Sequence, residues 1–294
     1  MSPQRTRFSL LPLLAACVLL ASLTACWAQP SSESAAPRFT AERHFKGKAL
    51  ELAKAVDRND AAAIQRLIQQ EGVDPNVIFT EQAMPMVAWP ILNKNPTGLR
   101  LLLEAGADPN ARRVDPNRTS GQQRNNAMVL AAGEPDSRYL AILLEHGGDP
   151  NTHNSNGEML TYVAYLRDQW QNVQLLVKHG ANINEGLYSP DDYNTIASWY
   201  SGLGNFDKVY WLLQQGADPT LQMRVPEGHV NHGRMPILES IFWLPVQPHM
   251  VDWQRKCQRW AMDKGIGRPP LPQYLKEKRE KLGLPGEEMD APLL

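Results

Sequence analysis

Residues 101–110 read Leu-Leu-Leu-Glu-Ala-Gly-Ala-Asp-Pro-Asn, an apolar run followed by a glycine and then by an aspartate–proline pair. A glycine at position 106 can adopt the left-handed conformation that ends many helices. Asp108 precedes a proline and is therefore disfavoured in the helical region of backbone space. The segment predicts a helix that ends near Gly106 and a chain that leaves it in an extended direction.

This pattern occurs five times, and its glycines are Gly72, Gly106, Gly147, Gly180 and Gly216; the unit at Gly180 has Asn182-Ile183 in place of the aspartate–proline pair. Successive glycines are 34, 41, 33 and 36 residues apart. A second, shorter apolar segment occupies the first half of the units, as in residues 126–132 and 195–200. A repeat of this length is typical of solenoids, whose units bury their apolar faces only against their neighbours. The sequence therefore predicts a row of stacked helical hairpins.

The unit resembles the ankyrin repeat, which opens with T-P-L-H-x-A-A and closes with L-L-x-x-G-A-D. Pro85 keeps the proline of that opening and Thr195 its threonine, whereas no unit keeps the histidine. The resemblance covers about residues 46–220, with a degenerate further unit that extends it to about residue 265. It implies an all-α solenoid of about five to six helix-turn-helix units, with β-turn fingers and capping ends.

The two ends of the repeat region differ from its middle. The first unit is more charged than the others and is expected to serve as the N-terminal cap. Residues 236–242 are predicted to form the first helix of the last unit, and residues 251–262 are predicted to pack against it. The C-terminal extension, residues 266–294, is proline-rich at first, and within it residues 273–282 are predicted to form at most a short amphipathic helix.

The N-terminus has the pattern of a bacterial lipoprotein signal peptide over residues 1–25. Arg5 and Arg7 precede an apolar run that is too short for a membrane-spanning helix. The sequence from Leu23 to Cys26 resembles a lipobox, which implies cleavage after Ala25 and acylation of Cys26. The alternative is an ordinary secretion signal in which Cys26 is incidental.

A lipidated Cys26 would anchor the chain firmly to a membrane that faces the periplasm. Trp27 stands where an aspartate would resemble an inner-membrane retention signal, so the outer membrane is favoured. Residues 28–37 are small, polar and proline-bearing, and residues 26–45 are interpreted as the anchored N-terminus and its flexible tether.

Composition excludes some classes of protein. The net charge is −1, and no basic segment indicates a nucleic-acid binder. Cys257 is the one cysteine of the body, so an internal disulfide is not expected there. The body must be stabilised by packing, and it is expected to be monomeric when free.

The two longest steps between glycines place insertions at residues 111–125 and 185–194. Insertions in solenoids lie on loops, often on the binding face, and arginine and tyrosine are enriched in the centres of interfaces. The first insertion is basic and the second carries tyrosines and acids. The candidate partner-binding residues here are Arg112, Arg113, Arg118, Arg124, Tyr188, Asp191, Asp192 and Tyr193. The alternative is that both are solvated loops without a role.

Other candidates come from the family resemblance, which implies that certain helix residues face a concave groove. They are Glu158, Leu166 and Arg167 in the fourth unit, and Asn194, Gly202 and Leu203 in the fifth. Two leucines at such positions in adjacent units indicate an apolar patch. The large aromatic residues are instead expected to fill the core: Trp89, Trp170, Trp199, Tyr200, Trp211 and Trp243.

Residues of the kinds that bind metals or carry out catalysis form few clusters in this sequence. His229 and His232, with His249 and Cys257 further on, are the one cluster that resembles metal ligands. The two histidines lie in a Gly- and Pro-flanked loop, and no carboxylate is spaced to complete a zinc site, so a plain loop is the preferred interpretation. No nucleophile-elbow, P-loop or dinucleotide fingerprint is present. Neither a cofactor nor a metal nor enzymatic activity is expected.

An anchored solenoid without a catalytic cluster favours recognition of a protein. Single-tether ankyrin lipoproteins that face the periplasm resemble the immunity proteins encoded beside type VI secretion effectors, notably those that neutralise phospholipase toxins. This resemblance implies tight binding that covers the toxin's active site. The first alternative is an envelope scaffold or stress-protection partner of an endogenous periplasmic protein. The second is an enzyme or metal-binding protein that uses residues 229–249.

Overall fold

The computed structural model describes residues 39–79, 84–114, 124–187 and 193–286. The chain divides into two units, Met1–Ala36 and Pro37–Leu294. All described residues belong to the second unit, and the lipobox with Cys26 lies outside them.

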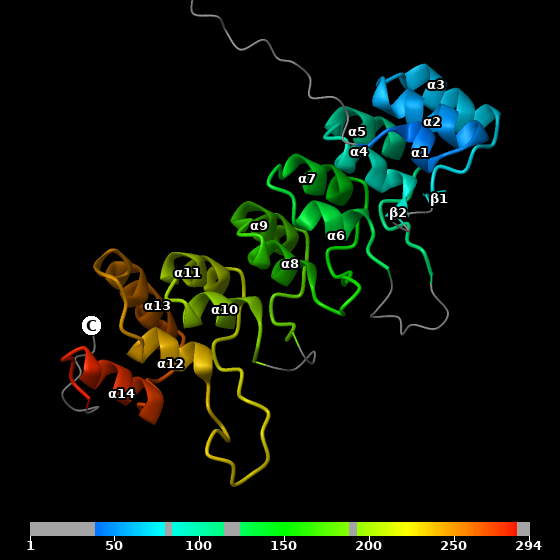
Figure 1. Cartoon of the computed structure of the whole chain (residues 1–294). Coiled ribbons are helices and arrows are strands. Elements are labelled where there is room, and N and C mark those ends of the chain that lie inside the picture. Colours follow the sequence, from blue (N-terminus) through cyan, green and yellow to red (C-terminus); the bar gives the residue numbers. More distant parts are fainter. Residues whose placement is uncertain (1–38, 80–83, 115–123, 188–192, 287–294) are drawn as a thin grey trace, which may run out of the picture. The chain divides into compact units, whose positions relative to one another are not determined.

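In the described part of the chain, six helical hairpins follow one another (Figure 1). Their first helices are α2 (Gly47–Asp57), α4 (Trp89–Leu92, preceded by the 3-10 turn η2, Met86–Ala88), α6 (Ala127–Ala132), α8 (Leu160–Leu166), α10 (Ile196–Gly202) and α12 (Pro236–Trp243). Their second helices are α3 (Ala61–Gln65, continued by the π-helical turn η1, Arg66–Gln70), α5 (Pro96–Glu104), α7 (Arg138–Glu145), α9 (Trp170–Lys178), α11 (Phe206–Gln214) and α13 (Val251–Asp263).

Each hairpin packs on the next one along the chain. First helices contact first helices, as α6 does α8 and α10 does α12, and second helices contact second helices, as α5 does α7 and α11 does α13. The apolar faces of both helices meet in one continuous core that runs through all the hairpins. The predicted all-α solenoid is confirmed, and the sixth hairpin confirms the degenerate unit that ends near residue 265.

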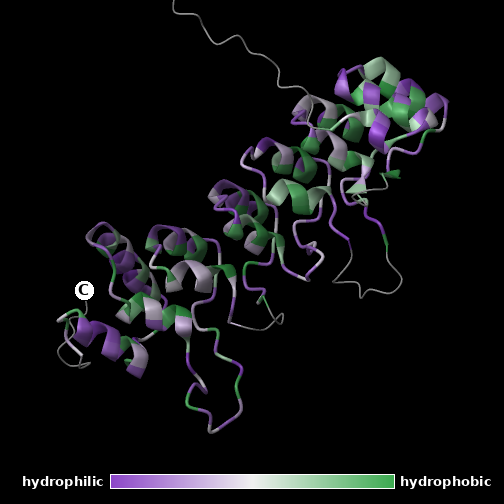
Figure 2. Ribbon diagram, viewed as in Figure 1, coloured by the Kyte–Doolittle hydropathy of each residue, from purple (hydrophilic) through white to green (hydrophobic). Residues whose placement is uncertain are grey.

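Five further elements complete the described fold. An antiparallel pair of strands, β1 (Ile78–Phe79) and β2 (Met84–Pro85), pairs Ile78 with Pro85 and Phe79 with Met84. The 3-10 turn η4 (Pro248–Met250) leads into α13, and α1 (Ala41–His44) and α14 (Gln273–Lys281) lie outside the hairpins in sequence. In Figure 2, α12 is largely apolar and α14 largely hydrophilic, which agrees with the burial of nearly every residue of α12.

The helix ends follow from the closing glycines. The five glycines of the repeated pattern have φ between 65° (Gly72) and 109° (Gly106), in the left-handed region. Gly265, after α13, has φ of 74° and ends the sixth hairpin in the same way. A side chain at these positions would strain the backbone, which is why the pattern requires glycine there.

The five turns are joined by a series of asparagine side chains, which we call the asparagine ladder: Asn76, Asn110, Asn151 and Asn184. The Oδ1 atom of each accepts the backbone N–H at the first polar position of the next turn, at 2.7–2.8 Å. The Nδ2 atoms of Asn110, Asn151 and Asn184 also donate to the carbonyl of the next closing glycine, at 2.9–3.1 Å. An amide can donate and accept at once, so Asn110, Asn151 and Asn184 each hold two backbone groups of the next turn, and Asn76 holds one. The turns are therefore aligned in a row, as the repeat predicts.

Removal of one link of this ladder should weaken the coupling between two hairpins. We expect Asn151→Ala to lower the free energy of unfolding by about 1–3 kcal/mol, because two hydrogen bonds to backbone groups are lost. Urea denaturation followed by circular dichroism measures this change. The control is Asn156→Ala, in an exposed turn, whose side chain lies outside the ladder. Equal stability of the two variants would contradict a structural role for the ladder.

The N-terminal end of the body begins earlier than the sequence indicates. Ala41 and Phe45 are buried, and the Phe45 ring lies 5.1 Å from Trp89 and 5.2 Å from Phe79, centroid to centroid. The tether predicted over residues 26–45 is therefore wrong at its C-terminal boundary, because α1 and Phe45 belong to the packed body. Composition does not predict that Phe45 packs on the body, because an aromatic residue in a polar segment does not show where its ring lies.

The C-terminal extension packs on the last hairpin. The predicted short helix is α14, and its Leu275 is buried. The indole Nε1 of Trp243 donates to the carbonyl of Pro269 at 2.9 Å, and the guanidinium of Arg268 lies 3.6 Å from the centroid of the same ring. The extension therefore covers the apolar end that a solenoid leaves unpaired.

The predicted aromatic core is confirmed in part. Trp89, Tyr200 and Trp243 are buried. The other three tryptophans, Trp170, Trp199 and Trp211, are only half-buried. They pack against other aromatic rings between the fourth and fifth hairpins, where Trp170 lies 5.4 Å from Trp211 and Trp199 lies 5.2 Å from Tyr162.

Candidate functional site

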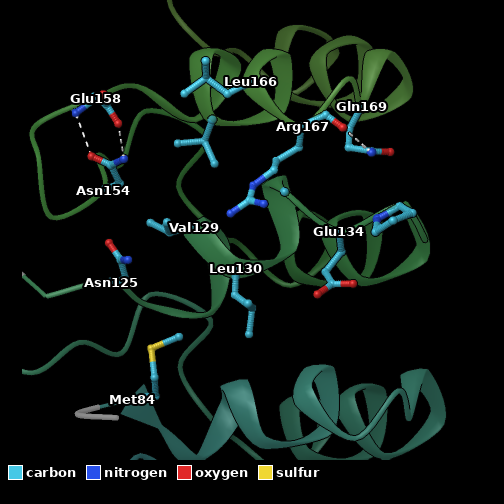
Figure 3. Close-up of a pocket in the computed structure, with 13 residues that line it drawn as sticks. Met84, Asn125, Val129, Leu130, Glu134, Asn154, Glu158, Leu166, Arg167 and Gln169 are labelled. Carbon is cyan, nitrogen blue, oxygen red and sulfur yellow. Dashed lines mark hydrogen bonds between the residues drawn. The ribbon is translucent and has the colours of Figure 1, made fainter.

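A groove of about 640 Å³ lies between the third and fourth hairpins (Figure 3). Its apolar lining comes from β2, α6 and α8 and consists of Met84, Val129, Leu130, Val163 and Leu166. Its polar lining comes from the turns at the ends of these elements and consists of Asn125, Glu134, Asn154, Glu158, Arg167 and Gln169. Two adjacent hairpins thus form one surface with an apolar centre and a polar rim.

Three of the residues predicted for a concave groove meet here. Glu158 precedes α8, Leu166 is its last residue and Arg167 its C-cap, and all three line the groove. Leu166 keeps 56% of its surface exposed, and Arg167 is exposed as well. The structure therefore brings these candidates together, although their contact with a partner remains a prediction.

Leu203 is the predicted counterpart of Leu166 in the fifth hairpin. It is 66% exposed, but it is not among the residues that line the groove. Leu166 stands 14 residues before its closing Gly180, whereas Leu203 stands 13 residues before Gly216. The two leucines are exposed, as predicted, and lie one position apart in the register of the repeat.

The charged side chains of the groove differ in whether they have a partner. Glu134 forms an ion pair with Lys94 from the preceding hairpin. Glu158 accepts a hydrogen bond from Nδ2 of Asn154 at 2.5 Å, and its backbone N–H donates to Oδ1 of the same residue at 2.9 Å (Figure 3). Arg167 makes no side-chain hydrogen bond or ion pair with any described residue. Its guanidinium is thus the cation that the groove offers to a ligand.

The first insertion is attached to the body through Arg112. This residue is half-buried, and its Nη2 donates to the carbonyl of His153 at 2.6 Å. Burial lowers the pKa of Arg112. Its guanidinium therefore positions the start of the insertion, a role that the sequence did not indicate because the acceptor lies 41 residues away.

The remaining candidates of the insertions are placed as follows. Arg113 and Arg124 are exposed, and Tyr193 and Asn194 are half-buried. The carbonyl of Asn194 accepts the backbone N–H of Leu187 at 3.1 Å, which closes the base of the second insertion. The other four candidates, Arg118, Tyr188, Asp191 and Asp192, lie outside the described residues.

His153 links the bases of the two insertions. Its carbonyl binds Arg112, and its ring Nε2 lies 2.6 Å from Oε1 of Glu185. The hydrogen bond to Glu185 raises the pKa of His153, and both side chains are mostly shielded from solvent. This pair could not be predicted from the sequence, since neither residue belongs to the repeated pattern.

Stability should depend on pH through this pair. Because the folded pKa of His153 lies above the unfolded value, its contribution is fully present below pH 6.5 and is lost as the pH rises through the folded pKa. We expect Glu185→Gln to cost about 1 kcal/mol near pH 5.5 and progressively less at higher pH. Melting temperatures of wild type and variant between pH 5.5 and 8.5 measure this, with His249→Gln, in an exposed position, as the control. A constant difference across that range would contradict the assignment.

A second cavity, of about 520 Å³, lies between the loop before α12 and the C-terminal extension. Arg234 pairs with the buried Glu239 through two hydrogen bonds of 3.0 and 2.6 Å, and the hydroxyl of Tyr274 lies 3.4 Å from Glu239. His232 lines this cavity, and its Nδ1 lies 3.1 Å from the carbonyl of Val225. Among the described residues, no three His, Cys, Asp or Glu side chains gather closely enough to hold a metal ion.

Comparison with known proteins identifies the fold. No family model matches the chain. The crystal structure of the ankyrin repeat domain of Bcl-3, described as a unique member of the IkappaB protein family, superposes with a TM-score of 0.51 at 23% identity, over 72% of this chain and 86% of that one. The chain has the ankyrin-repeat fold. A second ankyrin-repeat structure, EF0377, gives a TM-score of 0.45 at 22% identity over 62% of this chain and 89% of that one.

Two curated proteins share shorter stretches of sequence. Protein PhlB of Serratia liquefaciens is 30% identical over 106 residues, which is 36% of this chain and 42% of that protein. A putative ankyrin repeat-containing protein of Treponema pallidum (strain Nichols) is 40% identical over 63 residues, or 21% of this chain and 18% of that protein. The chain therefore spans less than half the length of either relative.

Within the described residues, no helix has both the length and the apolarity needed to cross a membrane.

Proposed function

We propose that this chain is a periplasmic immunity protein that binds and occludes a phospholipase-like toxin delivered by a type VI secretion system. The observation that supports binding most directly is the groove between the third and fourth hairpins. Two exposed residues, Leu166 and Arg167, lie at its edge on a backbone held by the asparagine ladder, and the arginine has no side-chain partner in the part of the chain that the structure describes. A firmly held surface loses little conformational entropy when it binds, which favours tight association.

Occlusion requires a binding surface and no chemistry of its own. The groove residues that could transfer protons are already engaged, Glu134 by Lys94 and Glu158 by Asn154. The exposed Arg113 and Arg124 stand at the two ends of the first insertion. We propose that the groove and this insertion together contact the toxin, and that the bound toxin cannot admit its substrate.

Location forms the second part of the proposal. Acylation of Cys26 would hold the body at the outer membrane on its periplasmic side, where a phospholipase-like toxin meets its substrate. We expect Cys26→Ser to release the protein from the membrane fraction into the soluble periplasmic fraction. Immunoblotting of fractionated cells measures this, with Cys257→Ser as the control because that thiol is buried in the body. Membrane retention of the Cys26→Ser protein would contradict lipidation.

The toxin assignment is tested by genetics and by binding. A gene for a secreted lipase-like protein beside this one, and growth loss of a deletion strain only in contact with sister cells, are the expected results. The purified neighbouring protein should bind the full-length chain and lose phospholipase activity on binding. A deletion strain that is harmed in pure culture would instead favour an envelope scaffold for an endogenous protein and would overturn the immunity role.

A further inference from the structure

We infer that the groove between the third and fourth hairpins recognises a protein segment in which a carboxylate side chain lies next to an apolar one. This inference rests on the proposed function, since it names the chemistry of the segment that the groove would hold. It depends on Arg167, on Gly133 and on the apolar residues beside them.

Arg167 supplies the site for the carboxylate. Its side chain extends from the end of α8 toward α6, over the groove (Figure 3). No described residue pairs with it, and an unpaired guanidinium at the edge of an apolar surface can bind a carboxylate through two parallel hydrogen bonds. The ligand therefore brings the negative charge that no described residue supplies to Arg167.

The two acids that line the groove have partners other than Arg167. The carboxylate of Glu134 is paired with Lys94, which comes from the second hairpin. That of Glu158 accepts from the amide of Asn154 within its own turn. Since both acids of the groove lining are engaged, an acid from the ligand is the complement of Arg167.

Gly133 makes room for this arrangement. A Cβ atom at Gly133 would lie 3.3 Å from Cγ of Arg167 and 3.9 Å from Cγ1 of Val163. The absence of a side chain there lets the Arg167 stem lie along the groove. The backbone of Gly133 has φ of −90° and ψ of −5°, which other residues adopt readily. The backbone conformation therefore does not require glycine at this position, whereas the small space beside Arg167 favours it.

The apolar part of the ligand has its own surface. Leu166 stands directly before Arg167 in the chain and is 56% exposed, and Leu130 and Val163 continue the apolar lining below it. An apolar side chain that covers Leu166 would also exclude water from the proposed ion pair between Arg167 and the ligand carboxylate, which would strengthen that pair. A single cation with apolar neighbours does not suit a nucleic-acid backbone, whereas it suits a loop or strand of a protein.

The test uses a phage-displayed library of random peptides, selected on the full-length protein and counter-selected on the Arg167→Glu variant. We expect enriched peptides to carry Asp or Glu beside Leu, Ile, Met or Phe. A synthetic peptide of that kind should bind Arg167→Glu at least about 10-fold more weakly than wild type. Replacement of its acid by lysine should restore binding to Arg167→Glu and weaken binding to wild type.

A steric variant with a matched control tests the same site independently. Gly133→Leu fills the groove, whereas Gly267→Leu places the same side chain on the C-terminal extension, outside the groove lining. A Cβ atom at Gly267 meets nothing within 4 Å. We expect Gly133→Leu to abolish peptide binding and Gly267→Leu to leave it unchanged, with equal melting temperatures.

The outcomes separate this inference from the proposed function. No enrichment, or enriched peptides without an acid that bind Arg167→Glu as well as wild type, would overturn the carboxylate site. A toxin that binds Arg167→Glu and wild type equally would also overturn it while leaving the immunity role intact. Peptides that behave as expected, together with a neighbouring toxin that does not bind, would support the site and overturn the immunity role.

Discussion

Replacement of Trp243 by alanine should lower the free energy of unfolding by about 3–5 kcal/mol, as for other fully buried tryptophans. Its ring is 1% exposed and lies at the end of α12. The substitution removes the indole hydrogen bond to Pro269 and the stacking of Arg268, and it leaves a cavity beneath the C-terminal extension. Arg279 also donates to the Trp243 carbonyl at 3.3 Å, so α14 loses part of its support if this segment shifts.

The loss should be confined to one end of the molecule. Because each hairpin contacts only its neighbours, instability at the sixth hairpin is transmitted weakly to the third and fourth. Hydrogen exchange measured by mass spectrometry should therefore show faster exchange in α12, α13 and α14, with α6 to α9 close to wild type. The control is Trp253→Ala on α13, a half-buried ring with Lys256 3.8 Å from its centroid. Faster exchange throughout the chain in Trp243→Ala would show that the hairpins unfold as one unit.

The double substitution Leu166→Asp with Leu203→Asp should weaken the complex with the protein partner by about 100-fold or more. Each aspartate would carry a charge into an apolar contact, where desolvation is costly. Both leucines are more than half exposed, so the free protein should melt within about 2 °C of wild type. Isothermal titration with the purified partner, together with thermal melts, measures both expectations.

The single variants distinguish the two leucines. Leu166→Asp should carry most of the effect, because Leu166 lines the groove and Leu203 does not. The control is Val230→Asp, since Val230 is 88% exposed on a loop away from this groove. An unchanged affinity of the double variant would place the interface on another face of the solenoid.

The fold was largely predictable because its signals are local. Glycine readily adopts the left-handed conformation that ends a helix, and a residue before a proline is disfavoured in the helical region, wherever they occur in a chain. Five helix ends and their spacing could therefore be derived from five short patterns. The asparagine ladder could also have been found. Asn76, Asn110, Asn151 and Asn184 close four of the five patterns, and Thr220 ends the series with a side chain that cannot replace the amide at both positions.

The site was predictable only in part. The exposure of Leu166 and Leu203 follows from their place in the repeat, and the structure confirms it. Arg112 was predicted to face a partner as one of four arginines in a polar insertion; that role stays a prediction, and the structure adds the hydrogen bond from its Nη2 to the carbonyl of His153. Sequence spacing cannot reveal such a contact, because it depends on how far one turn is displaced from the next.

The helix ends, the length of the unit and the alignment of the turns follow from the amino-acid sequence alone. They depend on backbone preferences within a few residues and on an asparagine that recurs at the same place in the unit. Other features are visible only in the folded chain: Leu166 and Arg167 share a groove with residues of the preceding hairpin, Phe45 and Leu275 pack on the two ends, and His153 connects two insertions. These contacts join side chains from different hairpins, and their geometry is set by the stacking of the repeats, which no single unit encodes.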